Sequence, residues 1–116
     1  MRRTALQYLD DILEAVGNIE EDTNGISYDE FSADRRRRDA VIRNFQVIGE
    51  AIKNLPDDLK TAYPETDWKK IAGFRDVLTH VYFGIKDTIL WDNATNKVPD
   101  LKKEVRHILR NEKKRK

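Results

Sequence analysis

The chain has 116 residues, and its 22 basic and 21 acidic side chains leave a formal net charge of only +1. This length fits one domain, and the absence of cysteine excludes disulfides, thiolate chemistry and cysteine-based zinc sites. No run approaches about 18 apolar residues, and charges interrupt the N-terminal segment where a signal peptide is apolar. We therefore expect a cytoplasmic protein without a membrane span.

Helical periodicity dominates the first half of the chain. Apolar residues that step alternately by four and three positions predict a helix from about Thr4 to Ile19. The acidic stretch 20–27 ends it, and a short helical turn is expected at 28–31. The same spacing predicts a long second helix from about Ala33 to Asn54, because the proline at position 56 ends it.

The second half continues the helical pattern. Asp67 is an N-cap residue type for a third helix that closes at Gly84. A fourth helix begins near position 87, with Ile89 and Leu90 on its inner side, and Pro99 kinks or restarts it. Since no alternating strand pattern is present, we predict an all-α, up-down bundle of four to five helices over residues 1–112, followed by a basic tail at 113–116.

Two glycines lie inside predicted helices, where glycine costs about 1 kcal/mol relative to alanine. These are Gly49 in the second helix and Gly73 in the third. We interpret both as positions where two helices cross closely.

The stretch R-D-V-L-T-H-V-Y-F-G, residues 75–84, places four polar side chains on the third helix. At about 100° per residue, Asp76 and His80 share one line of the helix, and Arg75 and Tyr82 share another. Arg75 and His80 are about 140° apart, so one regular helix cannot direct both at the same atom. A second copy across a two-fold axis could bring them into one shared groove, which predicts a homodimer.

These residue types are sufficient to cleave RNA without a metal. His80 can accept the proton of a ribose 2′-hydroxyl, and Arg75 can stabilise charge on the attacked phosphate. Asp76 would fix the tautomer of His80, and the expected product is a 2′,3′-cyclic phosphate. The residues alone also fit a core helix with a polar wet side. His80 and His107 supply too few ligands for a metal site.

The sequence resembles the HEPN superfamily, specifically the HepT-like toxins encoded beside a minimal nucleotidyltransferase antitoxin. R-D-V-L-T-H fits the superfamily's R-x(4–6)-H motif, and H-V-Y-F-G-I-K fits the H-x-Y form of this subgroup. D-A-V-I-R-N-F-Q-V-I-G-E-A, residues 39–51, looks like the subgroup's second-helix signature.

The resemblance implies the toxin of a type II-like or type VII toxin–antitoxin system, a homodimeric endoribonuclease that needs neither metal nor other cofactor. Arg75 and His80 match the family's catalytic pair, and Asp76 occupies the supporting position after the arginine. Tyr82 matches the tyrosine that the partner nucleotidyltransferase modifies with AMP. Adenylate there would add bulk and negative charge beside the RNA groove.

Two interpretations stay open. The run Arg35, Arg36, Arg37 and Arg38 could extend the RNA path, bind an acidic surface of the antitoxin, or be a solvated helix start. The whole chain could instead be a non-catalytic helical subunit that binds substrate or acts as a scaffold in a two-component nucleotidyltransferase.

Overall fold

The computed structural model of the protein describes residues 3–80 and 86–115, except for the side chains of Thr79 and His80. Within these residues the chain is helical and contains no strand, which confirms the predicted all-α class. Four long helices form the bundle: α1 (Ala5–Thr23), α3 (Arg35–Asn54), α5 (Trp68–His80) and α7 (Val98–Lys114). Short helices α2 (Tyr28–Ala33), α4 (Asp57–Ala62) and α6 (Asp87–Asp92) connect them.

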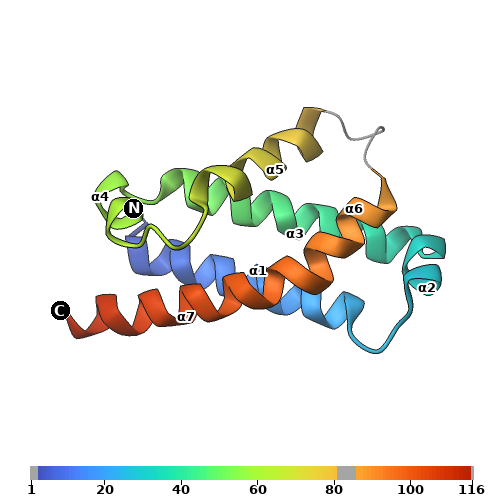
Figure 1. Ribbon diagram of the computed structural model, residues 1–116, viewed down its shortest axis with the longest axis horizontal. Coiled ribbons are helices and arrows are strands. Elements are labelled where there is room, and N and C mark those ends of the chain that lie inside the picture. The colour runs from blue at the N-terminus through green and yellow to red at the C-terminus, as the bar shows by residue number, and fades with distance from the viewer. Residues whose placement is uncertain (1–2, 81–85, 116) are drawn as a thin grey trace.

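The long helices lie in layers around a central pair. Figure 1 shows α1 and α3 side by side in the middle, with α5 on one side of this pair and α7 on the other. Apolar residues on the inner faces of α1, α3 and α7 form the core. Its fully buried members on these helices include Leu9, Ile12, Val16, Ile19, Val41, Ile48 and Val105.

Capping side chains set the starts of the first helices. The side-chain oxygen of Thr4 accepts a hydrogen bond from the backbone N–H of Gln7, and the side-chain oxygen of Gln7 accepts one from the backbone N–H of Thr4. Ser27 and Glu30 form the same reciprocal pair before α2. Helix α1 runs four residues beyond the predicted end. It stops at the turn in which Gly25 adopts a φ of 78°, a conformation that favours glycine.

The predicted boundaries of the later helices are mostly confirmed. Asp67 caps α5 by accepting a hydrogen bond from the N–H of Lys70 at 3.1 Å. Pro99 lies in the first turn of α7, and a π-helical turn, Asn93–Lys97, precedes that helix. Gly84, predicted to close the third helix, lies outside the described residues.

Two expectations from the pattern were wrong. The pattern does not predict helix α4, because Pro56 ends the preceding helix and is at the same time the N-cap of the next. Leu90 is fully buried as expected, but Ile89 is 46% exposed. Neighbouring helical residues differ by about 100° in direction, and in α6 the packed side includes Leu90 whereas Ile89 faces solvent.

The start of α6 is fastened to α2 and α3 by Asp87. Its carboxylate pairs with the guanidinium of Arg38 and accepts a hydrogen bond from the hydroxyl of Ser32 at 2.8 Å. Burial alone would raise the pKa of Asp87, but the hydrogen bonds from Arg38 and Ser32 outweigh it and lower the pKa. Asp87 therefore holds the first residues of α6 against α2 and the start of α3.

We predict that Asp87→Asn lowers the free energy of unfolding at neutral pH by about 1 kcal/mol, because the amide cannot pair with Arg38. A carboxyl whose pKa is depressed in the folded state stabilises fully above its unfolded pKa of about 3.9, and this stabilisation is lost as the pH falls through the folded value. Urea unfolding at neutral pH and at about pH 3 should show that the difference in unfolding free energy between the two proteins shrinks in acid. A gap of constant size down to about pH 3 would contradict this assignment.

Candidate active site

Helix α5 is fixed on the bundle at two points along its length. The rings of Phe74 and Phe45 meet edge to face, with their centroids 5.1 Å apart. At the start of α5, the indole N–H of Trp68 donates to two backbone carbonyl oxygens in and after α4, at 3.1 and 3.2 Å. These contacts fix the rotation of α5, so that Arg75 and Asp76 lie where α5 crosses α3.

The crossing depends on a missing side chain at Gly49. A Cβ added there would lie 2.1 Å from Cβ and 2.5 Å from Cγ of Arg75, closer than atoms can approach. The stem of Arg75 therefore occupies the space that any other residue at position 49 would need. This confirms the close crossing expected at Gly49. The expectation for Gly73 was wrong within the described residues, because a Cβ there would meet no atom within 4 Å.

Two carboxylates hold the guanidinium of Arg75. Nη2 lies 3.2 Å from a carboxylate oxygen of Glu50 on α3, and Nη1 lies 3.1 Å from Oδ1 of Asp76 on α5. The side chain of Arg75 is 25% exposed, whereas that of Glu50 is 59% exposed. The cation is thus set into the crossing, while both carboxylates are more exposed than it is, Glu50 the most.

Asp76 also binds a second cation, Lys53 of α3. Nζ of Lys53 donates to Oδ1 of Asp76 at 2.7 Å, the same oxygen that faces Arg75. The hydrogen bond from Lys53, followed by that from Arg75, lowers the pKa of Asp76 from its ordinary value. Asp76 is therefore a carboxylate throughout the neutral range.

Arg75, Asp76, Glu50 and Lys53 form what we call the charge quartet, two cations and two anions across the α3–α5 crossing. Sequence reasoning identified Arg75 and Asp76 but missed Glu50 and Lys53. Gly49 offered a signal, because a glycine inside a helix can allow a close crossing, and charged residues beside it on that face then meet the approaching helix.

Two members of the quartet, Arg75 and Asp76, lie on α5, the helix that ends at His80, one turn after Asp76. The side chain of His80 and all of Tyr82 fall outside the described residues, so the hydrogen bond expected between Asp76 and His80 stays a prediction. Among the described residues, both hydrogen bonds to Asp76 are made to Oδ1. A fixed guanidinium beside a carboxylate, partly open to water, can bind a phosphate and stabilise negative charge on it.

Nothing in the described part of the chain brings together three histidine, cysteine or carboxylate side chains as metal ligands. No helix in these residues is both long enough and apolar enough to cross a membrane.

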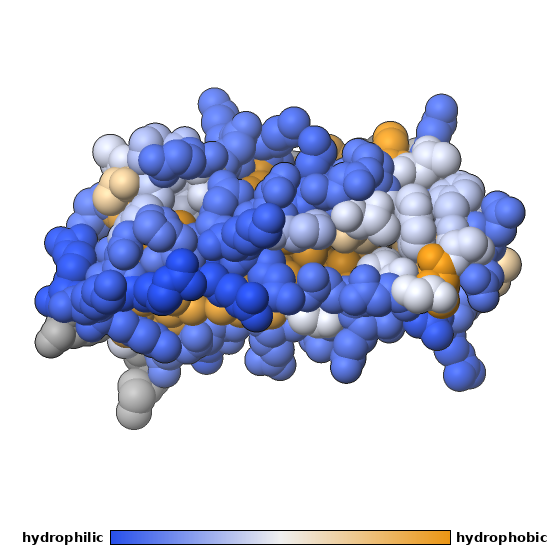
Figure 2. Space-filling view, turned by 60° about the horizontal axis from the view of Figure 1, so that its bottom comes forward, coloured by the Kyte–Doolittle hydropathy of each residue, from blue (hydrophilic) through white to orange (hydrophobic). Residues whose placement is uncertain are grey.

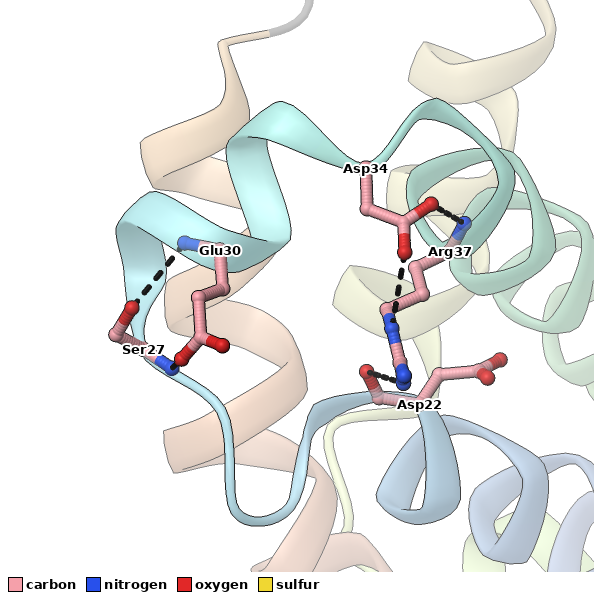
Figure 3. A network of polar contacts seen from close by, with 5 residues as sticks. All are labelled: Asp22, Ser27, Glu30, Asp34 and Arg37. Atoms are coloured by element: carbon pink, nitrogen blue, oxygen red, sulfur yellow. Dashed lines mark hydrogen bonds and ion pairs between the residues drawn. The ribbon is translucent and has the colours of Figure 1, made fainter.

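The run of four arginines starts α3 and divides into two kinds of residue. Arg37 donates from Nε to Asp34 at 3.1 Å and from Nη1 to the backbone carbonyl of Asp22 at 3.2 Å, as Figure 3 shows. Arg38 pairs with Asp87. Arg35 and Arg36 are exposed, and Arg35 approaches Asp39 only at 4.0 Å. Two of the four arginines therefore connect helices of the fold.

The all-α bundle is consistent with a HEPN-type protein. The family model described as "Ribonuclease HepT-like" matches residues 12–108. The chain belongs to this HepT-like family of the HEPN superfamily.

Relatives of known name agree with this assignment. The chain is similar to a "Putative RNase" of Methanocaldococcus jannaschii, with 48% identity over 89% of this chain and 85% of the relative. It is also similar to a "Probable ribonuclease HepT" of Thermococcus cleftensis, with 43% identity over 88% of this chain and 93% of the relative. No solved structure matches the chain significantly.

We predict that Gly49→Ala destabilises the protein by about 1–2 kcal/mol, because its methyl group must displace Arg75 and with it α5. Gly17→Ala is the matched control, since Gly17 also lies within a long helix but a Cβ there meets nothing within 4 Å. Without a clash, alanine in a helix should add up to about 1 kcal/mol. Urea unfolding of both variants tests the close crossing, and equal stabilisation by the two alanines would contradict it.

Proposed function

We propose that this protein is an endoribonuclease that cleaves RNA without a metal, through Arg75 and His80, and that it acts as the toxin of a toxin–antitoxin pair. The observation that carries the proposal is the setting of Arg75 at the α3–α5 crossing, on the same helix as His80. The family assignment and the names of the relatives support the ribonuclease activity.

The chemistry is an internal transesterification. His80 takes the proton from a ribose 2′-hydroxyl as its oxygen bonds to the adjacent phosphorus, and Arg75 stabilises the added negative charge. The bond from phosphorus to the 5′-oxygen then breaks, and that oxygen leaves with a proton from an imidazolium or from water. The products are a 2′,3′-cyclic phosphate and a 5′-hydroxyl, and no water is consumed in this step.

The charge quartet prepares Arg75 for this role. In the free protein the guanidinium pairs with Glu50 and Asp76, so an incoming phosphate must take the place of a carboxylate. Glu50 is the more exposed of the two and is the partner most readily displaced. Lys53 holds Asp76 in place, and Asp76 as a fixed anion would stabilise the imidazolium of His80 during the reaction.

We further propose that the active unit is a homodimer with a composite groove. On the ideal helix Arg75 and His80 diverge by about 140°, which favours contributions from two copies. The outer side of α5 offers a surface for this contact: Val77 is 42% exposed, and Gly73, one turn earlier, has open space beside it among the described residues. A small residue beside an apolar one allows two helices to approach closely.

We predict that the protein cleaves RNA in excess EDTA to products ending in 2′,3′-cyclic phosphate, and that His80→Ala lowers the rate by about 10²-fold or more. Cleavage would be measured on gels, with the termini identified by mass spectrometry. Loss of RNA at the same rate in both proteins would remove His80 from the mechanism. No cleavage by either would favour the scaffold subunit of a two-component nucleotidyltransferase.

The same assay tests the composite groove. A heterodimer of an Arg75→Ala chain and a His80→Ala chain, isolated with two affinity tags, contains one intact groove if the pair comes from different chains. It should then show about half the activity of the unsubstituted dimer, whereas each variant alone is inactive. An inactive heterodimer would place Arg75 and His80 of the same chain in one site.

Regulation is proposed to occur at Tyr82: a partner nucleotidyltransferase would transfer AMP from ATP to its hydroxyl oxygen, with loss of the hydroxyl proton and release of pyrophosphate. Tyr82 lies seven residues after Arg75, and its helical register would place an attached phosphate near that arginine, in competition with RNA. We predict that co-expression with the nucleotidyltransferase raises the intact mass by one or more AMP units and abolishes cleavage. An unchanged mass, or a shift that persists in Tyr82→Phe, would reject Tyr82 as the target.

A further inference from the structure

Helix α7 carries a row of cations that the proposed active site does not use. Its inner face is buried through Leu101, Val105 and Ile108, and the outer face carries the row. We call this row the basic stripe; its members are Lys103, Arg106, Arg110 and Lys114, and all four are exposed. Figure 2, which brings the α7 side forward, shows mostly hydrophilic side chains on this face, with hydrophobic patches between them.

The cations of the basic stripe follow one side of α7, and no nearby carboxylate among the described residues neutralises them. At about 100° per residue, Lys103, Arg110 and Lys114 fall within about 20° of one line, and Arg106 lies about 60° to its side. The line is about 16 Å long at a rise of about 1.5 Å per residue. In the described chain no carboxylate lies within 4.0 Å of any of the four cations, in contrast to Arg75, Arg37 and Arg38.

A pocket of about 380 Å³ opens beside the stripe. Two aromatic rings line it: His107 of α7 and Tyr63, which follows α4, meet edge to face with their centroids 6.3 Å apart. The hydroxyl of Tyr63 donates to Glu112 at 2.7 Å, and burial together with this hydrogen bond raises the pKa of Tyr63. The ring is therefore neutral and fixed in position.

The remaining lining of the pocket restricts what it can hold. Glu65 and Glu104 face it together with Thr66 and Lys103. Two carboxylates repel a phosphate but accept hydrogen bonds from the exocyclic amino groups of nucleobases. The pocket thus suits a base, and the stripe beside it suits the phosphates on either side of that base.

We propose that the basic stripe and the adjoining pocket form an accessory docking site for single-stranded RNA, separate from the Arg75 site on the far side of the α1–α3 pair. Cations along one line with an aromatic platform beside them are the features that bind single strands. The inference rests on the proposed ribonuclease function. Docking on α7 raises the local concentration of RNA, so it affects capture of the substrate and not the chemical step.

The test compares two charge-matched variants. Arg110→Gln with Lys114→Gln removes two stripe cations, whereas Arg43→Gln with Lys97→Gln removes two exposed cations elsewhere and leaves the same net charge. Both are made in the His80→Ala chain, and binding of a fluorescent, unstructured RNA of about 12 nucleotides is followed by anisotropy at several salt concentrations. Circular dichroism and thermal unfolding verify that each variant is folded.

The stripe variant should bind this RNA on the order of tenfold more weakly, and the slope of log K against log salt should fall by about 1.4, or about 0.7 for each lost contact. The control should change by less than about twofold. His107→Ala should weaken binding by a factor that does not vary with salt, because it removes a ring on which a base can stack. With His80 restored, the stripe variant should cleave saturating RNA at the unsubstituted rate.

Several outcomes would overturn the docking site. Equal weakening in the stripe and control variants would reduce the effect to net charge, and tighter binding of duplex RNA would exclude a single-strand site. Unchanged RNA binding with lost binding to the nucleotidyltransferase would make α7 a protein contact. If the unsubstituted protein neither binds nor cleaves RNA, the proposed function fails; normal cleavage with an inert stripe rejects the docking site alone.

Discussion

The approach of α5 to α3 at Gly49 is the constraint from which the candidate site follows. Because position 49 lacks a Cβ, the stem of Arg75 lies directly against the backbone of α3. This contact brings Arg75 and Asp76 within reach of the two charged side chains next along α3, Glu50 and Lys53. The edge-to-face contact of Phe74 with Phe45 fixes the rotation of α5 at the same crossing. A functional cation is thus positioned by packing of the backbone rather than by a flexible loop.

The sequence predicts the helices well because their cause is local. Apolar residues at steps of three and four positions mark the buried faces, and Asp67 marks a helix start through its own hydrogen bond. The errors have equally local causes. Pro56 both ends α3 and begins α4, and the periodicity could not separate these roles. Ile89 is apolar but faces outward, since only tertiary packing decides which of two adjacent apolar residues is buried.

The site was only half predictable. Arg75 and Asp76 were found because they share a helix, and distances along one helix follow from its geometry. Their partners Glu50 and Lys53 precede them by more than twenty residues, so only the three-dimensional crossing brings them together. For the arginine run, closeness in sequence was misleading, because it suggested a shared role that the four residues do not have. Four adjacent arginines suggest one basic surface, yet Arg37 and Arg38 are used to connect α3 to its neighbours.

The charge quartet has an electrostatic consequence for how a polyanion finds this protein. Two positive and two negative groups packed together cancel at distances larger than their separation, so their combined field decays faster than that of a single charge. Beyond a screening length of about 8 Å, the quartet itself contributes little to the field of the protein. Long-range attraction must then arise from cations placed elsewhere on the molecule. Substitutions that retune this attraction could accumulate on the outer surface without altering the geometry around the reacting phosphate.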